Sequence, residues 1–374
     1  MLKLSAFSSI IIPELNQDVV SLGCIRDLEI QDGKWLINLV LPTFGLKSEP
    51  EVAAAVKKAA YLSKSDDLDV TLNVFADVKP ATTQSLNKPG VSDVRNIVLV
   101  ASGKGGVGKS TVAANLAVAL ARMGCRVGLL DADVYGPSVP MMLGVPADVE
   151  IKGVRTDQSE ETFMIPVERH GLKLMSIGFL VDTSSAMIWR GPMIASASMQ
   201  MFNNVAWGEL DYLIVDMPPG TGDIQLTISQ RVAVAGVVIV STPQDVALAD
   251  VVRAKAMFDK VNTPSLGVVE NMSYFVCDGC DKRHEIFTHG GAQKAAQRLE
   301  IPFLGEIPIE MDVRQGSDEG MPAALKDTGL AAKAFKELAH EVATRLAKAA
   351  LEPAATQAAP SISVSGKRSL NVIN

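Results

Sequence analysis

The sequence is poor in cysteine, histidine and aromatic residues, and it has no excess of positive charge. Four cysteines in 374 residues are too few for a disulfide-stabilised framework, so a closely spaced pair is expected to bind a metal or to be redox-active. Lysine and arginine number 35 against 42 acidic residues, which gives a net charge of −7. This balance argues against a general nucleic-acid-binding surface.

Long apolar runs are also missing. The longest, Val232 to Val240, is far shorter than the roughly 20 residues that a membrane-spanning helix needs. The stretch from Met1 to Ile12 lacks a convincing cleavage site and the arginines of a transit peptide. With 48% hydrophobic and 21% charged residues, the composition suits a globular protein. We therefore expect a cytoplasmic protein that binds neither membrane nor nucleic acid.

The sequence does contain a glycine-rich stretch that fits the pattern G-x-x-x-x-G-K-[ST]. It reads Gly103-Lys104-Gly105-Gly106-Val107-Gly108-Lys109-Ser110-Thr111. Apolar residues 96–101 predict a buried strand before it, and alanine-rich residues 112–121 predict a helix after it. In such a loop the backbone N–H groups face phosphate oxygens, Lys109 reaches the β- and γ-phosphates, and Ser110 can bind Mg²⁺. The stretch predicts a site for ATP and Mg²⁺.

Lys104 is a second lysine in this loop. A nucleotide bound to one chain needs only Lys109, so Lys104 is surplus within that chain. Its position resembles the signature lysine of the deviant Walker A ATPases, which include the MinD/ParA proteins, the nitrogenase iron protein and the Mrp-type carriers. In those families the lysine crosses a dimer interface to the partner's nucleotide. The resemblance implies a homodimer and a catalytic role for Lys104 beside Lys109.

The chain divides into segments of different composition. Residues 1–78 are expected to form a small α+β domain, with a hairpin at Asp32-Gly33, a helix at 49–62 and a strand at 68–75. Residues 79–94 are rich in proline, glycine, serine and threonine and are expected to be a linker. The last segment, 351–374, is rich in alanine, proline and serine, which predicts a disordered tail.

Between linker and tail, residues 95–350 alternate between strand and helix patterns. Short apolar runs without polar alternation are typical of strands that are buried on both faces. They lie at 126–131, 172–177, 212–216, 236–241 and 266–270. The fold class is therefore predicted to be α/β, a P-loop NTPase with a mostly parallel, doubly wound sheet. An amphipathic helix at 331–351 is expected to close this domain.

Carboxylates follow two of the predicted strands. Asp131 and Asp133 end one strand and Asp216 ends another, where an ATPase needs carboxylates near Mg²⁺ and the attacking water. The structural alternative for each of these aspartates is that it caps the N-terminus of a helix. The surrounding stretches Asp131–Ser138 and Asp211–Asp223 resemble the two switch regions of Mrp-type proteins. That resemblance implies that Asp133 positions water and that Asp216 contacts Mg²⁺ through water.

A cysteine pair lies beyond the predicted strand that ends at Glu270. Cys277 and Cys280 have C-x-x-C spacing, which can clamp one metal or form a redox disulfide. One chain offers half of a four-thiolate site, and a two-fold dimer would complete it with either zinc or an iron–sulfur cluster. Asn271, six residues before Cys277, occupies the position that reads the adenine edge in Mrp-type proteins, although a plain turn role is the alternative.

The other candidate ligands are expected to be structural. This group comprises His284, His289, Cys24, Cys125, Met193, Met199 and Met201. The two histidines are interpreted as ordinary loop residues, Cys24 as a buried apolar residue and Cys125 as part of a turn. The methionines are expected to pack in the core or in an interface.

Taken together, the motifs resemble the Mrp/ApbC family over about residues 95–345. The stretches that carry the resemblance are 103–111, 131–138, 190–192, 211–223, 241–245, 271–280 and 305–310. The resemblance implies a carrier that hydrolyses ATP slowly, holds a [4Fe–4S] cluster between two subunits and passes it to apo iron–sulfur proteins, with scaffold proteins as further partners. The family often has proline where this chain has Asp278.

Residues 1–78 resemble the iron–sulfur assembly domain of MIP-type proteins. The resemblance lies in residues 13–15, 21–23 and 41–47. The chain departs from that pattern at two positions, because Ile12 replaces the usual aspartate and Phe44 replaces the usual cysteine. The fold is expected to persist, while thiol chemistry in this domain is not.

Two other functions remain open at this point. A positioning ATPase of the MinD/ParA kind would need a membrane-targeting amphipathic helix or a basic DNA-binding face, and cosedimentation with liposomes or DNA would reveal either. A zinc-stapled dimer that merely binds ATP would use the same cysteines, and metal analysis of anaerobically purified protein would separate it from a cluster carrier.

Overall fold

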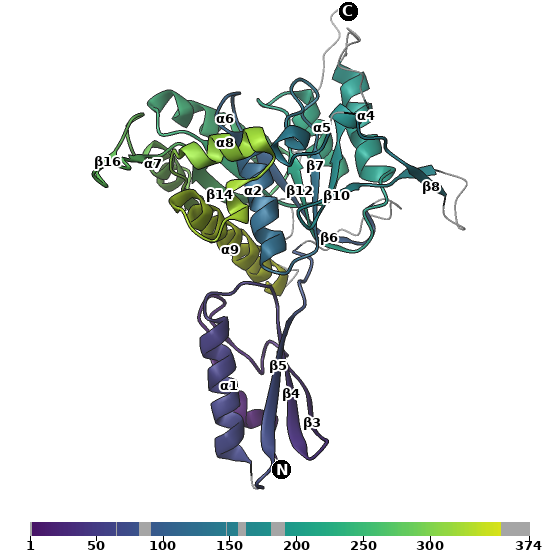
Figure 1. Cartoon of the computed structure of the whole chain (residues 1–374), viewed down its shortest axis with the longest axis vertical. Helices are drawn as coiled ribbons and strands as arrows, with labels where there is room; N and C mark the ends of the chain where they lie inside the picture. Colours follow the sequence, from purple (N-terminus) through teal and green to yellow (C-terminus); the bar gives the residue numbers. More distant parts are fainter. Residues whose placement is uncertain are drawn as a thin grey trace, which may run out of the picture.

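The structure, a computed structural model, describes residues 2–64, 66–81, 91–146, 148–155, 162–180 and 191–352. These residues form a small N-terminal domain that extends like a stalk from a larger α/β domain (Figure 1). Residues 82–90 of the predicted linker lie outside the described residues, as does the predicted tail from residue 353 on.

The N-terminal domain packs one helix, α1 (Glu49–Ser63), against a three-stranded sheet. Strands β3 (Ile25–Gln31) and β4 (Lys34–Leu41) form the predicted hairpin, whose turn residues have the positive φ angles of 48° and 73° that a two-residue hairpin turn requires. Strand β5 (Asp69–Ala76) then pairs parallel to β4. The remaining short elements are η1 (Leu4–Phe7), β1 (Ile11–Ile12) and β2 (Gln17–Asp18).

The larger domain is built on an eight-stranded sheet in the order β10-β11-β7-β12-β6-β13-β14-β17. All its strands run parallel except β10 at one edge. Their bounds are β6 (Val94–Ala101), β7 (Val127–Asp131), β10 (Val167–Arg169), β11 (Leu172–Ser176), β12 (Leu210–Asp216), β13 (Val234–Ser241), β14 (Ser265–Glu270) and β17 (Phe303–Glu306). The predicted P-loop NTPase fold with a mostly parallel sheet is confirmed.

Helices cover both faces of this sheet. The core on one face contains α2 (Lys109–Arg122) and α9 (Leu330–Leu351), and the core on the other contains α4 (Gly191–Asn203), α5 (Asp223–Arg231), α6 (Asp245–Lys260) and α7 (Gly291–Arg298). Helix α2 is apolar on nearly every side because it lies between the sheet and α9. Within the described part of the chain, no helix is long and apolar enough to cross a membrane.

Shorter elements decorate the edges of the sheet. They are α3 (Val139–Met142), η2 (Ile177–Phe179), α8 (Met311–Glu319), η3 (Ala323–Leu325), and the two-stranded pairs β8 (Gly153–Arg155) with β9 (Thr162–Met164) and β15 (Phe275–Val276) with β16 (Arg283–His284). The pair β15–β16 projects at the far side of the large domain from α4 (Figure 1).

The two domains touch through the segment 41–47 and the end of α9. Ala347 of α9 is buried within the core of the N-terminal domain, beside its helix and sheet. Thr43 and Tyr212, at the start of β12, share a buried hydrogen bond of 3.1 Å between their hydroxyl groups. Phe44 lies against Gly124, where a Cβ would approach the ring to 3.1 Å. The residue that replaces the expected cysteine thus packs against the end of α2.

Candidate nucleotide and metal-binding site

The phosphate-binding loop connects β6, at the middle of the sheet, to the start of α2. Gly106 and Gly108 have φ angles of 80° and 78°, which side chains rarely adopt. A Cβ on Gly103 would lie 2.4 Å from the carbonyl oxygen of Asp250. Helix α2 has no side-chain cap at its N-terminus, so its first N–H groups stay available to an anion.

Lys109 is buried at the first position of α2 and faces two carboxylates. Its Nζ donates to Asp216 Oδ1 at 2.6 Å and to Ser110 Oγ at 3.1 Å, and it lies 3.6 Å from Asp133 Oδ2. The strand register aligns Asp216 with Asp131 on the neighbouring β7. The fold therefore brings the predicted loop lysine, serine and aspartates together at the carboxyl ends of β7 and β12.

Asp131 lies beneath this cluster and is held by surrounding donors. It accepts hydrogen bonds from Ser176 Oγ at 3.0 Å and from the backbone N–H groups of Val139 and Asp133 at 3.3 and 3.2 Å. Burial, together with the nearby charge of Asp216, raises the pKa of Asp131 to about 8. Burial and the close approach of Asp216 thus disfavour the charged form of Asp131, and a cation bound beside these carboxylates would oppose that effect.

Asp216 is suited to a hydrated magnesium ion. Burial raises its pKa, while the charge of Lys109 and hydrogen bonds from Lys109 and Ser110 act in the opposite direction. Its Oδ2 is buried and has no hydrogen-bond partner among the described residues. A buried carboxylate oxygen without a partner, next to a serine hydroxyl, matches the oxygen ligands and retained waters that Mg²⁺ prefers.

The segment after Asp216 is held by a residue that sequence reasoning missed. Gln225 Nε2 donates to the carbonyl oxygens of Pro218 and Pro219, both at 3.0 Å, and its Oε1 accepts from the N–H of Gly222 at 3.0 Å. A glutamine three residues after a helix N-cap is the signal that could have identified it. Gln225 thereby orders the glycine-containing turn that follows Asp216.

Lys104 stands apart from these contacts. It is half-buried, and its ammonium group has no hydrogen bond or ion pair within the described residues. Its backbone oxygen accepts from Ser102 Oγ at 2.8 Å, which fixes the loop but leaves the side chain unengaged. The role of Lys104 in a dimer stays a prediction.

Asn271 braces the loop from the end of β14. Its Nδ2 donates to the carbonyl oxygen of Val107 at 2.9 Å, and its backbone N–H donates to Ser241 at 2.8 Å. A Cβ on Gly108 would lie only 2.1 Å from the same Nδ2, so glycine is required there. This contact adds a structural role that the sequence did not indicate, and adenine recognition by Asn271 stays a prediction.

The cysteine pair lies in the turn of the β15–β16 hairpin, beyond β14. Cys277 and Cys280 are free thiols, and Cys280 is exposed. The Cys277 carbonyl accepts from the N–H groups of Cys280 and Asp281 at 3.3 and 2.8 Å, which closes a tight turn. Hydrogen bonds from the Gly279 N–H, the Cys280 side chain and the Cys280 N–H lower the pKa of Cys277. The turn thus favours the thiolate that binds metal.

The other two cysteines differ from this pair. Cys24 and Cys125 are buried, and burial raises their pKa values to about 11 and about 12. Both match their predicted structural roles, since a buried apolar site disfavours the thiolate. His284 is exposed near Phe275, with the two ring centres 6.5 Å apart.

Among the methionines, Met199 and Met201 are buried in the core as predicted. Met193 is 51% exposed in this single chain, so core packing is wrong for this residue.

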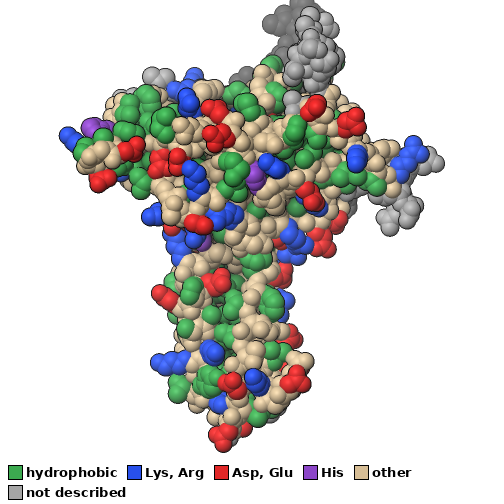
Figure 2. All heavy atoms as spheres, viewed as in Figure 1, with side chains coloured by type: hydrophobic (Ala, Val, Ile, Leu, Met, Phe, Trp, Pro, Cys, Tyr) green, Lys and Arg blue, Asp and Glu red, His purple; other side chains and the backbone are tan. Residues whose placement is uncertain are grey.

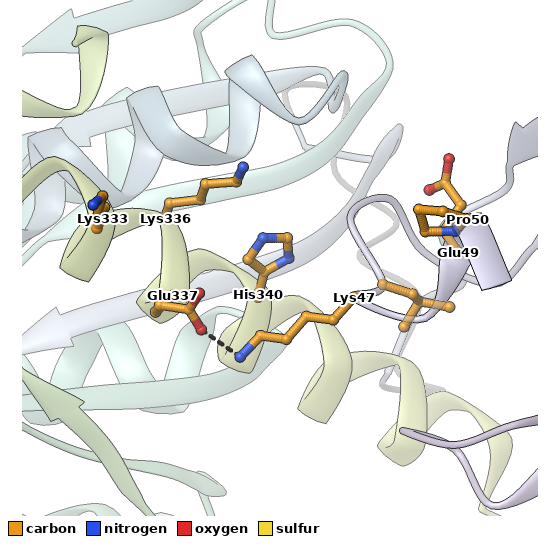
Figure 3. A pocket seen from close by; sticks show the side chains of 8 residues that line it. Lys47, Glu49, Pro50, Lys333, Lys336, Glu337 and His340 are labelled. Atoms are coloured by element: carbon orange, nitrogen blue, oxygen red, sulfur yellow. Dashed lines mark ion pairs between the residues drawn. The ribbon is translucent and has the colours of Figure 1, made fainter. Parts of the chain in front are cut away.

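A separate pocket of about 510 Å³ lies between the two domains (Figure 3). Side chains from α9 line one side and the start of α1 lines the other. An ion pair between Lys47 and Glu337 crosses it. The lining residues are Leu46, Lys47, Glu49, Pro50, Lys333, Lys336, Glu337 and His340, none of which belongs to the predicted site.

Comparison with known proteins agrees with this geometry. A protein from Deinococcus radiodurans described as an iron–sulfur cluster carrier protein is 46% identical, and the match covers 92% of this chain and 94% of that protein. A protein from Arabidopsis thaliana, described as an iron–sulfur protein required for NADH dehydrogenase, is 52% identical over 67% of this chain and 78% of its own length. A solved nucleotide-binding protein from Archaeoglobus fulgidus in complex with ADP matches with a TM-score of 0.54 and 43% identity, covering 62% of this chain and 88% of that one.

Two family profiles divide the chain between them. Residues 4–67 match the iron–sulfur cluster assembly protein family, in agreement with the resemblance of the N-terminal domain. Residues 93–343 match the profile described as NUBPL iron-transfer P-loop NTPase, which spans the nucleotide loop, the aspartates and the cysteine hairpin. The chain therefore belongs to the family of iron-transfer P-loop NTPases.

Proposed function

We propose that the protein is an ATP-hydrolysing iron–sulfur carrier that binds a [4Fe–4S] cluster between two copies of the chain and transfers it to apo-proteins. The observation that carries this proposal is the pair of free, accessible cysteines on a hairpin that begins at Phe275, shortly after Asn271, the residue that braces the phosphate loop. The cluster is cargo in this scheme, while ATP and Mg²⁺ serve the loop and its aspartates.

Nucleotide binding would exchange the partners of Lys109. The Lys109 ammonium pairs with Asp216 in the structure, and β- and γ-phosphates would compete for the same charge. Once Lys109 turns to the phosphates, Asp216 is free to hold a water of the Mg²⁺ shell and Ser110 to bind the ion. The bound Mg²⁺ supplies charge neutralisation for the phosphate oxygens. The proposal assigns Asp133 to orient the attacking water.

A dimer explains two features that one chain leaves incomplete. The Lys104 ammonium group has no hydrogen bond or ion pair within the described residues of its own chain, and a lysine in this position could reach the nucleotide of a second chain. Cys277 and Cys280 supply two thiolates, whereas a [4Fe–4S] cluster takes four ligands. A two-fold arrangement supplies both the missing cation contact and the missing thiolates.

The two alternatives make different demands on the molecule. A zinc-stapled dimer would use the same four thiolates, and the relatives described as iron–sulfur cluster carriers favour a cluster over zinc. A positioning ATPase would not need the exposed thiol pair. Cluster binding is therefore the function that accounts for the largest part of the site.

Anaerobic reconstitution with iron and sulfide tests this proposal. Wild-type protein is expected to gain iron, sulfide and the visible absorption of an iron–sulfur cluster, whereas Cys277→Ala and Cys280→Ala should hold little cluster. Cys125→Ala is the matched control, because that thiol is buried away from the hairpin and should not affect cluster content. Equal iron and sulfide in the hairpin variants and the wild type would refute the site.

A further inference from the structure

The cysteine hairpin is too small to hold its own shape. Each strand has two residues, Phe275–Val276 and Arg283–His284, with a turn that contains both thiols. Isolated two-stranded hairpins are at best marginally stable in water, and one of this size needs support from outside. Some contact with the body of the domain must therefore set where Cys277 and Cys280 lie.

Among the described residues, the backbone hydrogen bonds that join the hairpin to the body of the domain involve its first strand. The Ser273 N–H donates to Ile307 at 2.9 Å, and the Ile309 N–H donates to Tyr274 at 2.7 Å. Phe275 then forms an isolated parallel β-bridge with Ile309. These contacts fix the chain as it enters the hairpin, but none of them reaches the returning strand β16.

Arg283 is the side chain that attaches the returning strand. Its guanidinium carbon lies 3.9 Å from the centre of the Tyr274 ring, and its Nη2 donates to Glu306 Oε2 at 3.0 Å. The same group lies 3.1 Å from His289 Nδ1. Arginine only donates, so His289 Nδ1 must accept and its proton resides on Nε2, which faces Glu306 Oε1 at 3.5 Å. We name Arg283, Tyr274, Glu306 and His289 the arginine latch.

Two residues of the arginine latch, together with Glu270, form a cluster of potential metal ligands. Ligand atoms of Glu270, His289 and Glu306 lie within 4.8 Å of one another. However, Glu270 already accepts from Ser273 Oγ and the Ala292 N–H, both at 2.7 Å. The guanidinium of Arg283 already supplies positive charge to Glu306, and the protonated Nε2 of His289 offers no lone pair. The positive charge in this cluster therefore comes from Arg283 rather than from a metal ion.

We infer that Arg283 is the positioning residue of the thiol pair, and that it holds Cys277 and Cys280 in a fixed relation to the segment that braces the phosphate loop. The inference rests on the proposed function. Asn271 bonds the loop at Val107, and three residues later Tyr274 carries the guanidinium of Arg283. A shift of the phosphate loop on nucleotide exchange would therefore move the segment from Asn271 to Tyr274. The contact of Arg283 with Tyr274 would pass this movement on to the cysteines.

The latch needs the shape of arginine as well as its charge. A half-exposed ion pair alone stabilises little, and the Arg283 and Glu306 side chains are 42% and 22% exposed. The planar guanidinium can stack on a ring while its N–H groups bond two acceptors, whereas a lysine ammonium is a compact point charge that lacks this planar fork. The conservative variant Arg283→Lys should therefore restore only part of the function.

The test measures the rate of cluster loss rather than the stability of the fold. Protein reconstituted anaerobically is mixed with an iron chelator, with and without ATP and Mg²⁺, and the visible absorption is followed in time. Arg283→Ala should release its cluster about tenfold faster, at the lower end of the effect of residues that orient metal ligands. It should also lose most of the difference between the nucleotide-bound and nucleotide-free rates. Arg283→Lys should lie between Arg283→Ala and the wild type.

Lys282→Ala is the matched control. Lys282 is exposed beside Arg283, carries the same charge near the thiols, and its side chain makes no hydrogen bond or ion pair within the described residues. Its removal should leave the rate of cluster loss unchanged. Glu306→Gln weakens the latch from its other side and should speed cluster loss in the same direction as Arg283→Ala.

Three results would overturn the inference. They are an Arg283→Ala rate equal to wild type, an equal acceleration by Lys282→Ala, which would assign the effect to charge alone, and a parallel loss of ATP binding in Arg283→Ala, which would assign Arg283 to the stability of the whole domain. If the wild type itself fails to hold a cluster, the proposed function fails instead.

Discussion

Lys109 and Lys104 differ in what the chain itself offers them. Lys109 is 6% exposed and bonded to Asp216, so its position is set before nucleotide arrives. Lys104 is half-buried in the same loop, without a hydrogen bond or ion pair for its ammonium group among the described residues. Lys109 thus belongs to a site that is formed within one chain, while we propose that Lys104 acts on the nucleotide of a second chain.

This difference predicts a separation of ATP binding from hydrolysis. Lys104→Ala should lower the hydrolysis rate about 100-fold or more, because a cation supplied from a partner stabilises the charge of the phosphoryl-transfer transition state. Its affinity for ATP should change little. Lys109→Ala, as the comparison, should weaken both. Nucleotide affinity by calorimetry and phosphate release in the steady state measure the two effects, and a parallel loss of both in Lys104→Ala would contradict transfer across an interface.

At the level of residues, the loop and its aspartates could be predicted because their pattern is dense and local. Gly103 to Thr111 carries its spacing in the sequence, and Asp131 and Asp216 each follow an apolar run. Arg283 and Gln225 could not be identified in the same way. Arg283 bonds Glu306, which lies 23 residues further along the chain, and a single arginine in a polar segment carries no periodic signal. Gln225 is marked in the sequence only by its place three residues after a helix N-cap.

Two elements connect the nucleotide-binding domain to the N-terminal domain. Helix α2 starts at the phosphate loop and ends near Gly124, against which Phe44 packs. Strand β12 ends at Asp216 and starts near Tyr212, whose hydroxyl bonds Thr43. The segment 41–47 thus touches the far ends of two elements whose other ends form the nucleotide site.

The docked segment gives a prediction about Phe44. Phe44→Ala removes a half-buried ring, and we expect the docking to weaken by about 2 kcal/mol, less than the cost for a fully buried phenylalanine. Local opening would then speed amide hydrogen exchange in residues 41–47 about 30-fold. Phe75→Ala is the control, since Phe75 lies in the same domain but is 52% exposed. Equal exchange in the two variants would show that the segment is not fastened by Phe44.

Secondary structure was predictable where elements are long and buried. Central strands such as β6 and β13 are continuous apolar runs, and α9 shows helical spacing over its length. The edge strands β10 and β17 and the hairpin β15–β16 were not predicted. Each is short and partly exposed, so pairing with neighbours distant in sequence decides its conformation rather than any local pattern.

For the molecule as a whole, the nucleotide loop and the cysteine hairpin lie in one domain, joined by the segment from Asn271 to Cys277. Helix α9 links this domain to the other, since its final residues are buried in the core of the N-terminal domain. With a buried Cys24 and with Phe44 in place of the usual cysteine, that domain offers no accessible thiol among its described residues. Under the proposed function, the cluster is therefore expected on the hairpin of the large domain.

We propose that two chains share one cluster through four thiolates. Native mass spectrometry of anaerobically reconstituted protein measures the number of chains, iron atoms and sulfides in one particle. We expect two chains with a single [4Fe–4S] cluster, and a loss of that species in Cys277→Ala and Cys280→Ala. A single chain that holds the whole cluster, or a dimer that holds zinc without sulfide, would contradict it.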